Sequence, residues 1–250
     1  MERLFVNPRY AAAFARRDWN SFSSVFRHFA PNYVRRRKML VQRVSIPLPE
    51  GAVPAFFKLY HHARSGWRFW MRHSKARREF ENYATFERLG IPAAERIACG
   101  EERDWTGRLN RAFILTRAVP DASELDAFLR SGPLIHHRRR ILENLAGMVK
   151  RLHSADFFHH DLVARNILVS QETPGSEPRL FLIDSPRGEF ARLGKERKRL
   201  RDLASLDKTA SQLCSRAERL RFLLRYLEKP RVDDEVRSVA CGCLHYGRRH

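Results

Sequence analysis

Residues 159–166 read His-His-Asp-Leu-Val-Ala-Arg-Asn. Further along the chain, Asp184 directly follows a short apolar run that ends at Ile183. Asn166 lies five residues after Asp161 and directly before the apolar residues 167–169. Residues 180–183 form a second short apolar run, and a hairpin of these two strands would hold Asn166 and Asp184 at one end. We therefore predict that Asp161, Asn166 and Asp184 share one polar site.

The residue types at this predicted site suit phosphoryl transfer from ATP. That reaction depends on a positioned metal ion, neutralised phosphate charge and an oriented acceptor hydroxyl. We expect Asp161 to accept or orient the proton of that hydroxyl. Oxygen atoms are the ligands that Mg²⁺ prefers, so the Asn166 amide and the Asp184 carboxylate are the predicted metal ligands.

Lys58 supports this reading, because it lies in the predicted strand 53–60 and could reach the α and β phosphates of ATP. A buried lysine needs a counter-charge. Glu79 lies in the predicted helix 75–89 and is the expected partner, whereas Glu81 falls on a different face of that helix. A strand lysine, a helix glutamate, a catalytic loop and an aspartate after a strand thus occur in the order found in protein kinases.

The remaining pattern predicts an α+β fold of the two-lobed protein-kinase type, with a small antiparallel sheet followed by a mainly helical part. Strands are expected at residues 39–46 and 53–60, which should form a hairpin around the turn at 47–51, and at 97–101, 112–116, 167–169 and 180–183. Helices are expected within 10–29 and at 75–89, 124–129, 137–154 and 201–227. Asn20 is the expected N-cap of an early helix, and Gly90 should end the helix that carries Glu79. We predict one kinase-like domain over residues 1–250, with an N-terminal lobe at 1–117 and a C-terminal lobe at 118–250.

Three residues around the predicted site have expected structural roles. His159 should anchor the catalytic loop from inside the protein, whereas His160 should be exposed. Asp202 should brace the backbone of the same loop from the start of a helix.

The formal net charge of +20 predicts contact with a polyanion: nucleic acid, an anionic membrane, a phosphorylated glycolipid or an acidic protein. Basic surface without interleaved aromatic residues for stacking does not favour nucleic acid. No apolar run approaches the roughly 18 residues needed to cross a bilayer, which predicts a cytoplasmic protein that is soluble or peripheral. Cys99, Cys214, Cys241 and Cys243 are expected to be reduced, structural thiols.

Two departures from protein kinases argue against a protein substrate. No Ala-Pro-Glu follows Asp184, and Asp202 comes only eighteen residues later, which leaves little room for an activation segment. No Gly-x-Gly-x-x-Gly precedes Lys58, and residues 31–39, where it would fall, are basic.

With these departures, the chain resembles the lipopolysaccharide kinase (Kdo/WaaP) family, bacterial enzymes with a minimal protein-kinase-like fold that phosphorylate inner-core sugars of lipopolysaccharide. The segments that carry the resemblance lie between about residues 20 and 230: Ala55–Tyr60, Ala76–Phe80, Leu89–Pro92, Phe113–Thr116, His159–Asn166, Leu182–Arg187, Arg201–Leu203 and Leu220–Leu227. Their order, rather than any single segment, supports the resemblance.

The resemblance implies ATP as the phosphoryl donor, Mg²⁺ as the cofactor, and a hydroxyl of heptose or of 3-deoxy-D-manno-octulosonic acid (Kdo) as the acceptor. It implies Asp161 as the catalytic base, Lys58 and Glu79 as the phosphate-holding pair, and Asn166 and Asp184 as metal ligands. The backbone from Thr116 to Ala118 would hydrogen-bond adenine.

The implied acceptor, lipid A-core, is an anionic glycolipid held in the membrane, so we expect peripheral contact with the cytoplasmic face of the inner membrane. The basic runs Arg35–Lys38, His136–Arg140 and Arg192–Arg201 could face such a surface. The alternatives are a kinase of another small molecule, an atypical, tyrosine-like protein kinase, and a pseudokinase that binds an acidic partner. The intact set of Lys58, Asp161, Asn166 and Asp184 argues against the pseudokinase.

Overall fold

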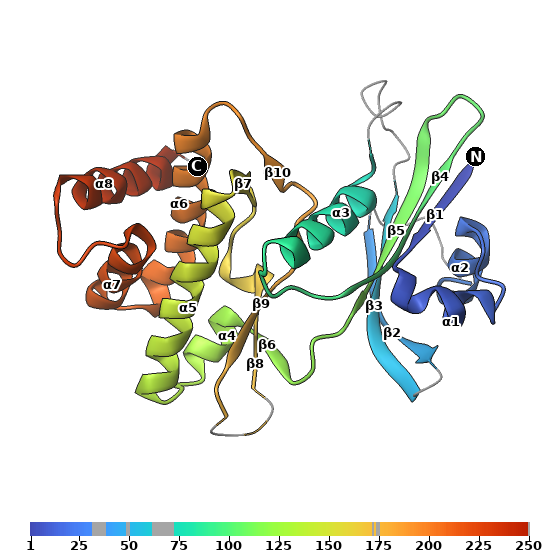
Figure 1. Ribbon diagram of the computed structural model, residues 1–250, viewed down its shortest axis with the longest axis horizontal. Helices are drawn as coiled ribbons and strands as arrows, with labels where there is room; N and C mark the ends of the chain where they lie inside the picture. The colour runs from blue at the N-terminus through green and yellow to red at the C-terminus, as the bar shows by residue number, and fades with distance from the viewer. Residues whose placement is uncertain (32–38, 49–50, 62–72, 172, 174–175, 250) are drawn as a thin grey trace. The chain divides into compact units, whose positions relative to one another are not determined.

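The computed structural model describes residues 1–31, 39–48, 51–61, 73–171, 173 and 176–249, which Figure 1 draws in colour. The chain divides into two units. Unit 1 comprises residues 1–84 and 94–118, and unit 2 comprises residues 85–93 and 119–250. The basic run Arg35–Lys38 and most of the stretch predicted to cover the phosphates, residues 31–39, lie outside the described residues.

An antiparallel five-stranded sheet forms the centre of unit 1, in the order β1-β4-β5-β3-β2. Its strands are β1 (Glu2–Val6), β2 (Met39–Leu48), β3 (Gly51–His61), β4 (Arg96–Arg103) and β5 (Leu109–Arg117). The predicted hairpin is confirmed, since β2 pairs with β3 from Met39 opposite Tyr60 to Leu48 opposite Gly51. The sequence pattern does not predict β1, because two charged residues begin this five-residue strand.

A 3₁₀ turn (Pro8–Tyr10) and helices α1 (Ala11–Ala15) and α2 (Phe22–Phe29) cover one face of this sheet (Figure 1). Their buried side chains pack against inward-facing residues of the sheet in one cluster, which includes Phe14, Trp19, Phe22, Val25, Phe29, Phe57, Leu59, Ile97 and Phe113. Side chains alternate along a strand, so Lys58, which stands between two members of this cluster, points to the opposite face.

Helix α2 begins after Ser21, whereas the sequence pattern suggests Asn20 as its N-cap. Ser21 Oγ accepts a hydrogen bond from the Ser24 N–H, and Ser24 Oγ accepts one from the Ser21 N–H, both at 3.1 Å. This reciprocal capping box satisfies two backbone donors at once, so the prediction of Asn20 is wrong.

Helix α3 (Lys75–Arg88) begins in unit 1 and ends in unit 2, close to its predicted limits. Ser74 Oγ caps its start by accepting a hydrogen bond from the backbone of the first turn at 3.0 Å. At its end, Gly90 has a left-handed φ of 62°, and the Ile91 N–H donates to the Phe86 carbonyl at 2.9 Å. The glycine therefore closes the helix as predicted.

Unit 2 is mainly helical, which confirms the predicted α+β class with the helices in the C-terminal part. Its helices are α4 (Leu125–Arg130), α5 (Ile135–Ser154), α6 (Lys195–Leu213), α7 (Arg216–Leu227) and α8 (Asp234–Arg249). One small sheet has the order β6-β8-β9, formed by Ala122–Glu124, Ile167–Ser170 and Arg179–Leu182, and another pairs β7 (Phe157–Phe158) with β10 (Glu189–Phe190). The β8–β9 hairpin is the one predicted from residues 167–183.

The single helix predicted for residues 201–227 is wrong in two respects. Helix α6 already begins at Lys195, and the chain breaks after Leu213 before α7 starts. Ser215 and Glu218 form a capping box there, which satisfies the first backbone donors of α7 and favours a new helix over continuation of the old one.

No helix within the described ranges is both long and apolar enough to cross a membrane. All four cysteines are free thiols, and Cys99 is buried in β4. Burial raises the pKa of the Cys99 thiol, so this side chain stays protonated near neutral pH.

Gly100 of β4 lies against the aromatic core, where a Cβ would stand 2.4 Å from Phe113 Cε1 and 3.0 Å from Phe22 Cδ2. We expect Gly100→Ala to lower the free energy of unfolding by about 1–3 kcal/mol, because the rings must move to admit a methyl group. Gly147→Ala is the matched control: its Cβ would meet nothing within 4 Å, and it should raise the stability by about 0.5–1 kcal/mol. Urea unfolding followed by circular dichroism measures both, and a Gly100→Ala protein as stable as wild type would contradict this packing.

Candidate active site

Lys58 and Glu79 form an ion pair in unit 1. Lys58 Nζ lies 3.4 Å from Glu79 Oε2, and the Lys58 side chain is 14% exposed whereas that of Glu79 is almost fully buried. The Glu79 carboxylate also accepts hydrogen bonds from the hydroxyls of Tyr60 at 2.9 Å and Tyr83 at 3.4 Å. The pairing expected from the sequence is therefore present. The two tyrosines were not predicted, although Tyr83 lies four residues after Glu79 on α3 and Tyr60 lies two residues after Lys58 on β3, spacings that place each tyrosine on the same face as its neighbour.

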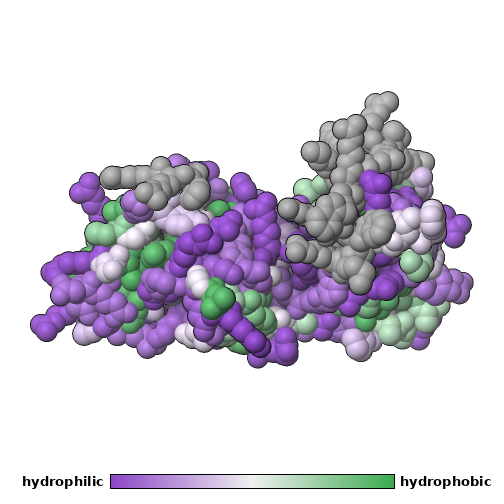
Figure 2. All heavy atoms as spheres, turned by 90° about the horizontal axis from the view of Figure 1, so that it is seen from above, coloured by the Kyte–Doolittle hydropathy of each residue, from purple (hydrophilic) through white to green (hydrophobic). Residues whose placement is uncertain are grey.

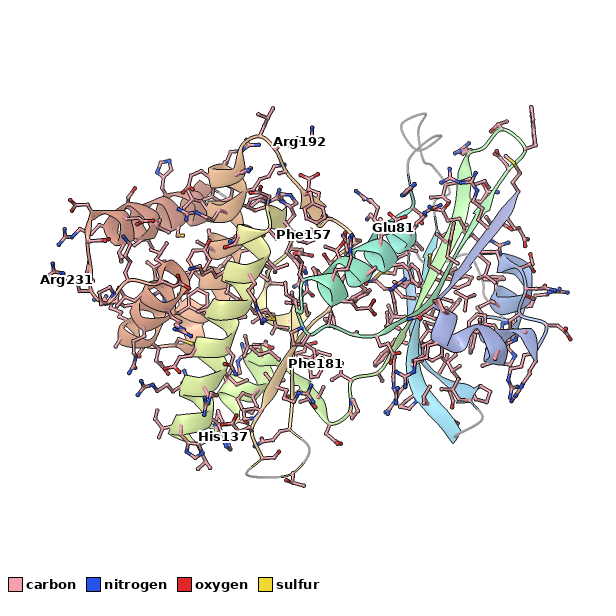
Figure 3. The ribbon with its side chains drawn as sticks, in the orientation of Figure 1. Glu81, His137, Phe157, Phe181, Arg192 and Arg231 are labelled. Atoms are coloured by element: carbon pink, nitrogen blue, oxygen red, sulfur yellow. The ribbon has the colours of Figure 1, made fainter. Side chains whose placement is uncertain are left out.

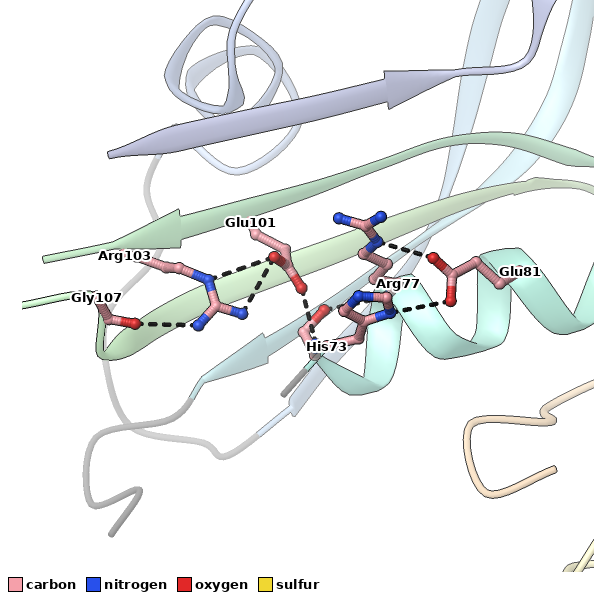
Figure 4. A network of polar contacts seen from close by, with 7 residues as sticks. His73, Arg77, Glu81, Glu101, Arg103 and Gly107 are labelled. Carbon is pink, nitrogen blue, oxygen red and sulfur yellow. Dashed lines mark hydrogen bonds and ion pairs between the residues drawn. The ribbon is translucent and has the colours of Figure 1, made fainter. Parts of the chain in front are cut away.

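A polar network fixes the start of α3 to the sheet of unit 1 (Figure 4). The Ser74 N–H donates to the buried Glu101 carboxylate at 2.7 Å, and Arg103 Nη2 donates to the same group at 3.2 Å. Burial by itself raises the pKa of Glu101, but these hydrogen bonds outweigh it and hold the pKa below its usual value. The Glu101 carboxylate is thus charged. It fixes the start of α3, the helix from which Glu79 projects.

Glu81, the alternative partner for Lys58, is engaged elsewhere on α3. It accepts a hydrogen bond from Arg77 Nε at 2.8 Å, and its other oxygen lies 3.1 Å from His73 Nδ1 (Figure 4). The choice of Glu79 over Glu81 is therefore confirmed, and it follows from helical geometry because residues two apart face different directions.

Asp161 and Asn166 are joined through the backbone of their loop in unit 2. Asn166 Nδ2 donates to the Asp161 carbonyl at 2.9 Å, within a 3₁₀ turn (Ala164–Asn166) that leads into β8. The Asn166 carbonyl in turn accepts from the Ile183 N–H at 3.0 Å. Asp184 is the next residue, so the β8–β9 hairpin brings Asn166 and Asp184 to the same end of the ladder.

The backbone is strained at two residues of this loop region. His160, directly before Asp161, has a φ of 63°, and Asp184 has a φ of 55°. The left-handed conformation costs a residue other than glycine about 1–2 kcal/mol. Such conformations persist only where surrounding contacts hold them, so the contacts of His160 and Asp184 matter for the site.

Asp202 supplies the contacts that hold His160. Its carboxylate accepts from the His159 N–H at 2.7 Å and from the His160 N–H at 2.8 Å, and lies 3.4 Å from His153 Nε2. Burial by itself raises the pKa of Asp202, but the hydrogen bonds from His153 and from the His159 amide outweigh it, so the pKa lies below its usual value. The predicted brace is confirmed, although Asp202 lies inside α6, which begins at Lys195, rather than at a helix start.

The two histidines of the loop differ from one another. His159 is buried with its ring parallel to that of Phe86 at a centroid distance of 6.3 Å, as expected of an anchor, and burial lowers its pKa. The prediction that His160 is exposed is wrong, because its side chain is 8% exposed and its Nε2 lies 3.1 Å from Glu189 Oε1. No local pattern indicates this contact, since Glu189 belongs to β10 and comes from beyond Asp184.

Thr116 and Ala118, the residues expected near adenine, lie at the end of β5 and just after it in unit 1. Thr116 pairs with Phe56 of β3 and Arg96 of β4. The Ala118 N–H donates to the Pro54 carbonyl at 2.9 Å. Adenine bound here would therefore use another backbone group of residues 116–118, or displace that hydrogen bond.

The donor atoms of Asn166 and Asp184 can be compared with the needs of Mg²⁺. Because Asn166 Nδ2 donates to Asp161, the Asn166 Oδ1 is left as an acceptor. Asp184 adds a carboxylate at the end of the same hairpin. Mg²⁺ at nucleotide sites is bound by one or two carboxylates together with substrate phosphates and waters. The two residues fit an ion of this kind.

The two described basic runs differ in how far the protein itself neutralises them. In His136–Arg140, three arginines pair with acidic residues: Arg138 with Glu218, Arg139 with Glu143 and Arg140 with Glu177. In Arg192–Arg201, the paired residues are Lys195, Lys198 and Arg199, with Asp156, Glu189 and Glu196 respectively. The first run is therefore largely neutralised, and the second only in part.

A model of the lipopolysaccharide kinase (Kdo/WaaP) family matches residues 58–226, more than half of the chain. The chain belongs to this family. Two 3-deoxy-D-manno-octulosonic acid kinases of Haemophilus influenzae are similar over shorter stretches. The kinase of strain 86-028NP is 30% identical over 122 residues, which are 48% of this chain and 46% of the relative. The kinase of strain PittEE is 29% identical over 103 residues, which are 40% of this chain and 42% of the relative. The chain thus spans less than half the length of these curated relatives.

A solved structure described as WaaP in complex with acyl carrier protein has a TM-score of 0.71 to this Kdo/WaaP family chain, at 23% sequence identity. The likeness covers 99% of this chain and 97% of the other. The predicted fold class, a kinase-like fold with an antiparallel sheet in its N-terminal part and helices in its C-terminal part, is therefore confirmed. The range matched by the family begins at Lys58 and extends beyond Asp184, so it includes every predicted site residue.

Replacing Asp202 should remove the brace of the catalytic loop. We expect Asp202→Asn to lower the free energy of unfolding by about 1.5–3 kcal/mol at pH 7, because the backbone amides lose a charged acceptor. Folding lowers the pKa of Asp202. The extra stability of wild type over Asp202→Asn is therefore complete above the unfolded pKa of about 3.9, and it is lost as the pH falls through the lower pKa of the folded state.

Urea unfolding between pH 7 and pH 2 measures this difference. Asp207→Asn, on the same helix, is the matched control and should change stability by less than about 1 kcal/mol, because its ion pair with Arg219 is partly exposed. A stability gap between wild type and Asp202→Asn that stayed constant across the whole pH range would contradict the charged brace.

Proposed function

We propose that the chain is an ATP-dependent kinase that phosphorylates a hydroxyl of an inner-core sugar of lipopolysaccharide. The observation that carries the proposal is the loop of Asp161 and Asn166: Asp202 holds its backbone, and the β8–β9 hairpin ties it to Asp184. Membership of the Kdo/WaaP family supports the same reaction.

In the proposed reaction, Asp161 is the catalytic base. Its carboxylate accepts the proton of the acceptor hydroxyl while the hydroxyl oxygen forms a bond to the γ-phosphorus of ATP. The bond between the γ-phosphorus and the oxygen that bridges to the β-phosphate breaks, and ADP leaves with that oxygen. The brace from Asp202 holds the loop backbone, so Asp161 needs little reorganisation when the acceptor arrives.

The remaining site residues hold ATP in this proposal. Lys58 binds the α and β phosphates, and Glu79 positions Lys58 through their ion pair. Mg²⁺ held by Asn166 and Asp184 would neutralise charge on the phosphates. The backbone from Thr116 to Ala118 would bind adenine through groups other than the engaged Ala118 amide.

Kdo is the acceptor that we propose first. The relatives with 29–30% identity are kinases of this sugar by name, and their similarity in sequence supports the same acceptor for this chain. The likeness to WaaP rests on 23% identity and bears on the fold alone. Heptose is the alternative acceptor.

The membrane-held acceptor places the protein at the cytoplasmic face of the inner membrane in this proposal. The net charge of +20 supports contact with an anionic surface, because each basic residue near such a surface contributes on the order of 1 kcal/mol. A kinase of another small molecule and an atypical protein kinase remain the alternative enzymes. The acceptor that receives phosphate from ATP distinguishes these enzymes from one another. A pseudokinase that binds an acidic partner would show no transfer to any acceptor.

The decisive variant is Asp161→Ala. We expect it to keep the fold and to lower the rate of phosphate transfer from ATP to a Kdo-terminated core oligosaccharide by about 10²–10⁴-fold, because the acceptor proton loses its base. Mass spectrometry of the oligosaccharide product measures the transfer, and a parallel reaction with a heptose-terminated acceptor distinguishes the two sugars.

Asp234→Ala is the matched control, since Asp234 is an exposed aspartate at the start of α8. It should transfer phosphate at the wild-type rate. Wild-type protein that phosphorylates neither sugar, while releasing ADP with a different acceptor, would show that the lipopolysaccharide assignment is wrong.

We further propose an acidic protein partner, and the solved structure of WaaP in complex with acyl carrier protein suggests which kind of partner it is. A cavity of about 500 Å³ lies among α4, α5, α6, α7 and α8 of unit 2. Its lining is mostly apolar and includes Leu129, Leu206 and Phe222, with Arg216 also present. An apolar cavity of this size suits an acyl chain, and a basic chain suits an acidic carrier.

Ala210 of α6 lines this cavity, so a larger side chain there should fill it. We expect wild-type protein to bind acylated acyl carrier protein about tenfold or more tightly than the unacylated form, because even a few buried methylene groups contribute that difference. Ala210→Phe should remove the preference while leaving binding of the unacylated carrier unchanged. Isothermal titration calorimetry measures both affinities, and equal affinities in the wild type would exclude acyl-chain binding in the cavity.

A further inference from the structure

The segment that links Asp184 to α6 exposes two large apolar side chains. Leu193 is 85% exposed and Phe190 is 57% exposed. Among the described residues of unit 2, no large apolar side chain is more exposed than Leu193. A single exposed leucine is ordinary on a protein surface, so its meaning depends on the groups around it.

Contacts on both sides hold the segment that carries these side chains. β10 pairs with β7 so that Phe190 lies opposite Phe157, and the two rings meet edge to face with centroids 5.3 Å apart. The Ala191 N–H donates to the Asp156 carbonyl at 3.0 Å, and Lys195 Nζ lies 2.6 Å from Asp156 Oδ2. The exposed tip is thus carried by backbone that is hydrogen-bonded to the segment directly before the catalytic loop.

The acidic residues of the segment are all paired, whereas only some of its basic residues are. Glu189 contacts Lys198 and His160, and Glu196 contacts Arg199. Four arginines form no ion pair with any residue in the described part of the chain: Arg187, Arg192, Arg197 and Arg201. Arg192 lies on the outer side of the link between β10 and α6 (Figure 3). We call Arg187, Phe190, Arg192, Leu193 and Arg197 the tip surface.

We propose that the tip surface docks on an anionic lipid bilayer, with Leu193 and Phe190 between the headgroups and the arginines on lipid phosphates. Exposed apolar side chains beside unpaired basic ones are the combination that binds such interfaces, through buried apolar area and attraction to anionic lipid. A stable protein interface needs about 800 Å² from each partner. Two apolar side chains cannot supply its core, and hydrophobic areas on the face seen in Figure 2 are small and separated by hydrophilic ones.

This docking deepens the proposed function and rests on it for its purpose, since it would bring the enzyme to a membrane-held acceptor. The β7–β10 pair connects the two places, because β7 ends at Phe158, three residues before Asp161. Unit 2 alone carries both the tip surface and Asp161. The depth at which Leu193 and Phe190 enter the bilayer would therefore set the height of Asp161 above it.

Vesicle co-sedimentation of the full chain tests the proposal. Wild-type protein should bind vesicles of mixed phosphatidylcholine and phosphatidylglycerol and bind pure phosphatidylcholine much more weakly. Leu193→Ser should weaken binding to the mixed vesicles about tenfold, as expected for losing much of one buried leucine. Arg192→Gln should weaken it about fivefold, and added salt should reduce this effect.

Two variants elsewhere in unit 2 serve as matched controls. Ile135→Ser removes a side chain that is 77% exposed at the start of α5, and the helix extends about 30 Å from there toward β7. Arg231→Gln removes an exposed arginine of the α7–α8 connection (Figure 3). Both should bind mixed vesicles as the wild type does.

Leu193→Trp should show a blue shift of its added fluorescence on mixed vesicles.

The outcomes separate this proposal from the kinase assignment. Equal vesicle binding by Leu193→Ser and Ile135→Ser would overturn the docking surface, as would equal binding of wild type to neutral and mixed vesicles. Asp161→Ala should bind vesicles as wild type does, because Asp161 is no part of the tip surface. Leu193-dependent binding without phosphate transfer by wild type would uphold docking and refute the proposed function.

Discussion

The buried carboxylate of Asp202 is the contact on which the catalytic loop depends. Two consecutive amides, those of His159 and His160, donate to this one carboxylate, and the second of these residues has a left-handed φ. His153 contacts the same carboxylate, and its other ring nitrogen lies 2.8 Å from the Tyr226 hydroxyl. Helices α5, α6 and α7 therefore meet at one charged group, which the low dielectric of the interior makes costly to disturb.

In unit 1, the buried carboxylate of Glu79 has a comparable role. Glu79 receives Lys58 and two tyrosine hydroxyls, so its charge is satisfied from several directions. The helix that carries it is fixed at its first turn by Glu101, another buried acid. In a chain with a net charge of +20, the few acidic groups that enter the interior thus position the basic and backbone groups of the candidate site.

The excess positive charge is not spread evenly over the surface of unit 2. The run His136–Arg140 is largely neutralised by neighbouring carboxylates, whereas the segment after Asp184 keeps arginines that pair with no acid among the residues that the structure describes. Net charge therefore predicts a polyanionic partner but not the surface that meets it. Pairing inside the fold decides which guanidinium groups remain for a partner.

The sequence by itself determined the elements whose signals are local. Alternation predicted the β2–β3 hairpin, a glycine after the last turn predicted the end of α3, and helical spacing selected Glu79 rather than Glu81 as the partner of Lys58. The spacing of Asp161, Asn166 and Asp184 around two short strands also placed the latter pair at one hairpin end. These features depend on residues close in sequence, or on a periodicity that one segment carries by itself.

Only the tertiary structure decided the rest. Strands β7 and β10 have two residues each and are too short to show a pattern, and β1 begins with two charged residues. These strands form because a partner strand offers hydrogen bonds. The position of Asp202 inside α6, the contact of His160 with Glu189 and the engagement of the Ala118 amide by Pro54 each join segments that are distant in sequence. Their energies come from burial and from partners that no local window contains. The sequence therefore predicted that Asp202 braces the catalytic loop, but not that it does so from inside α6, nor the contacts of His160 and Ala118.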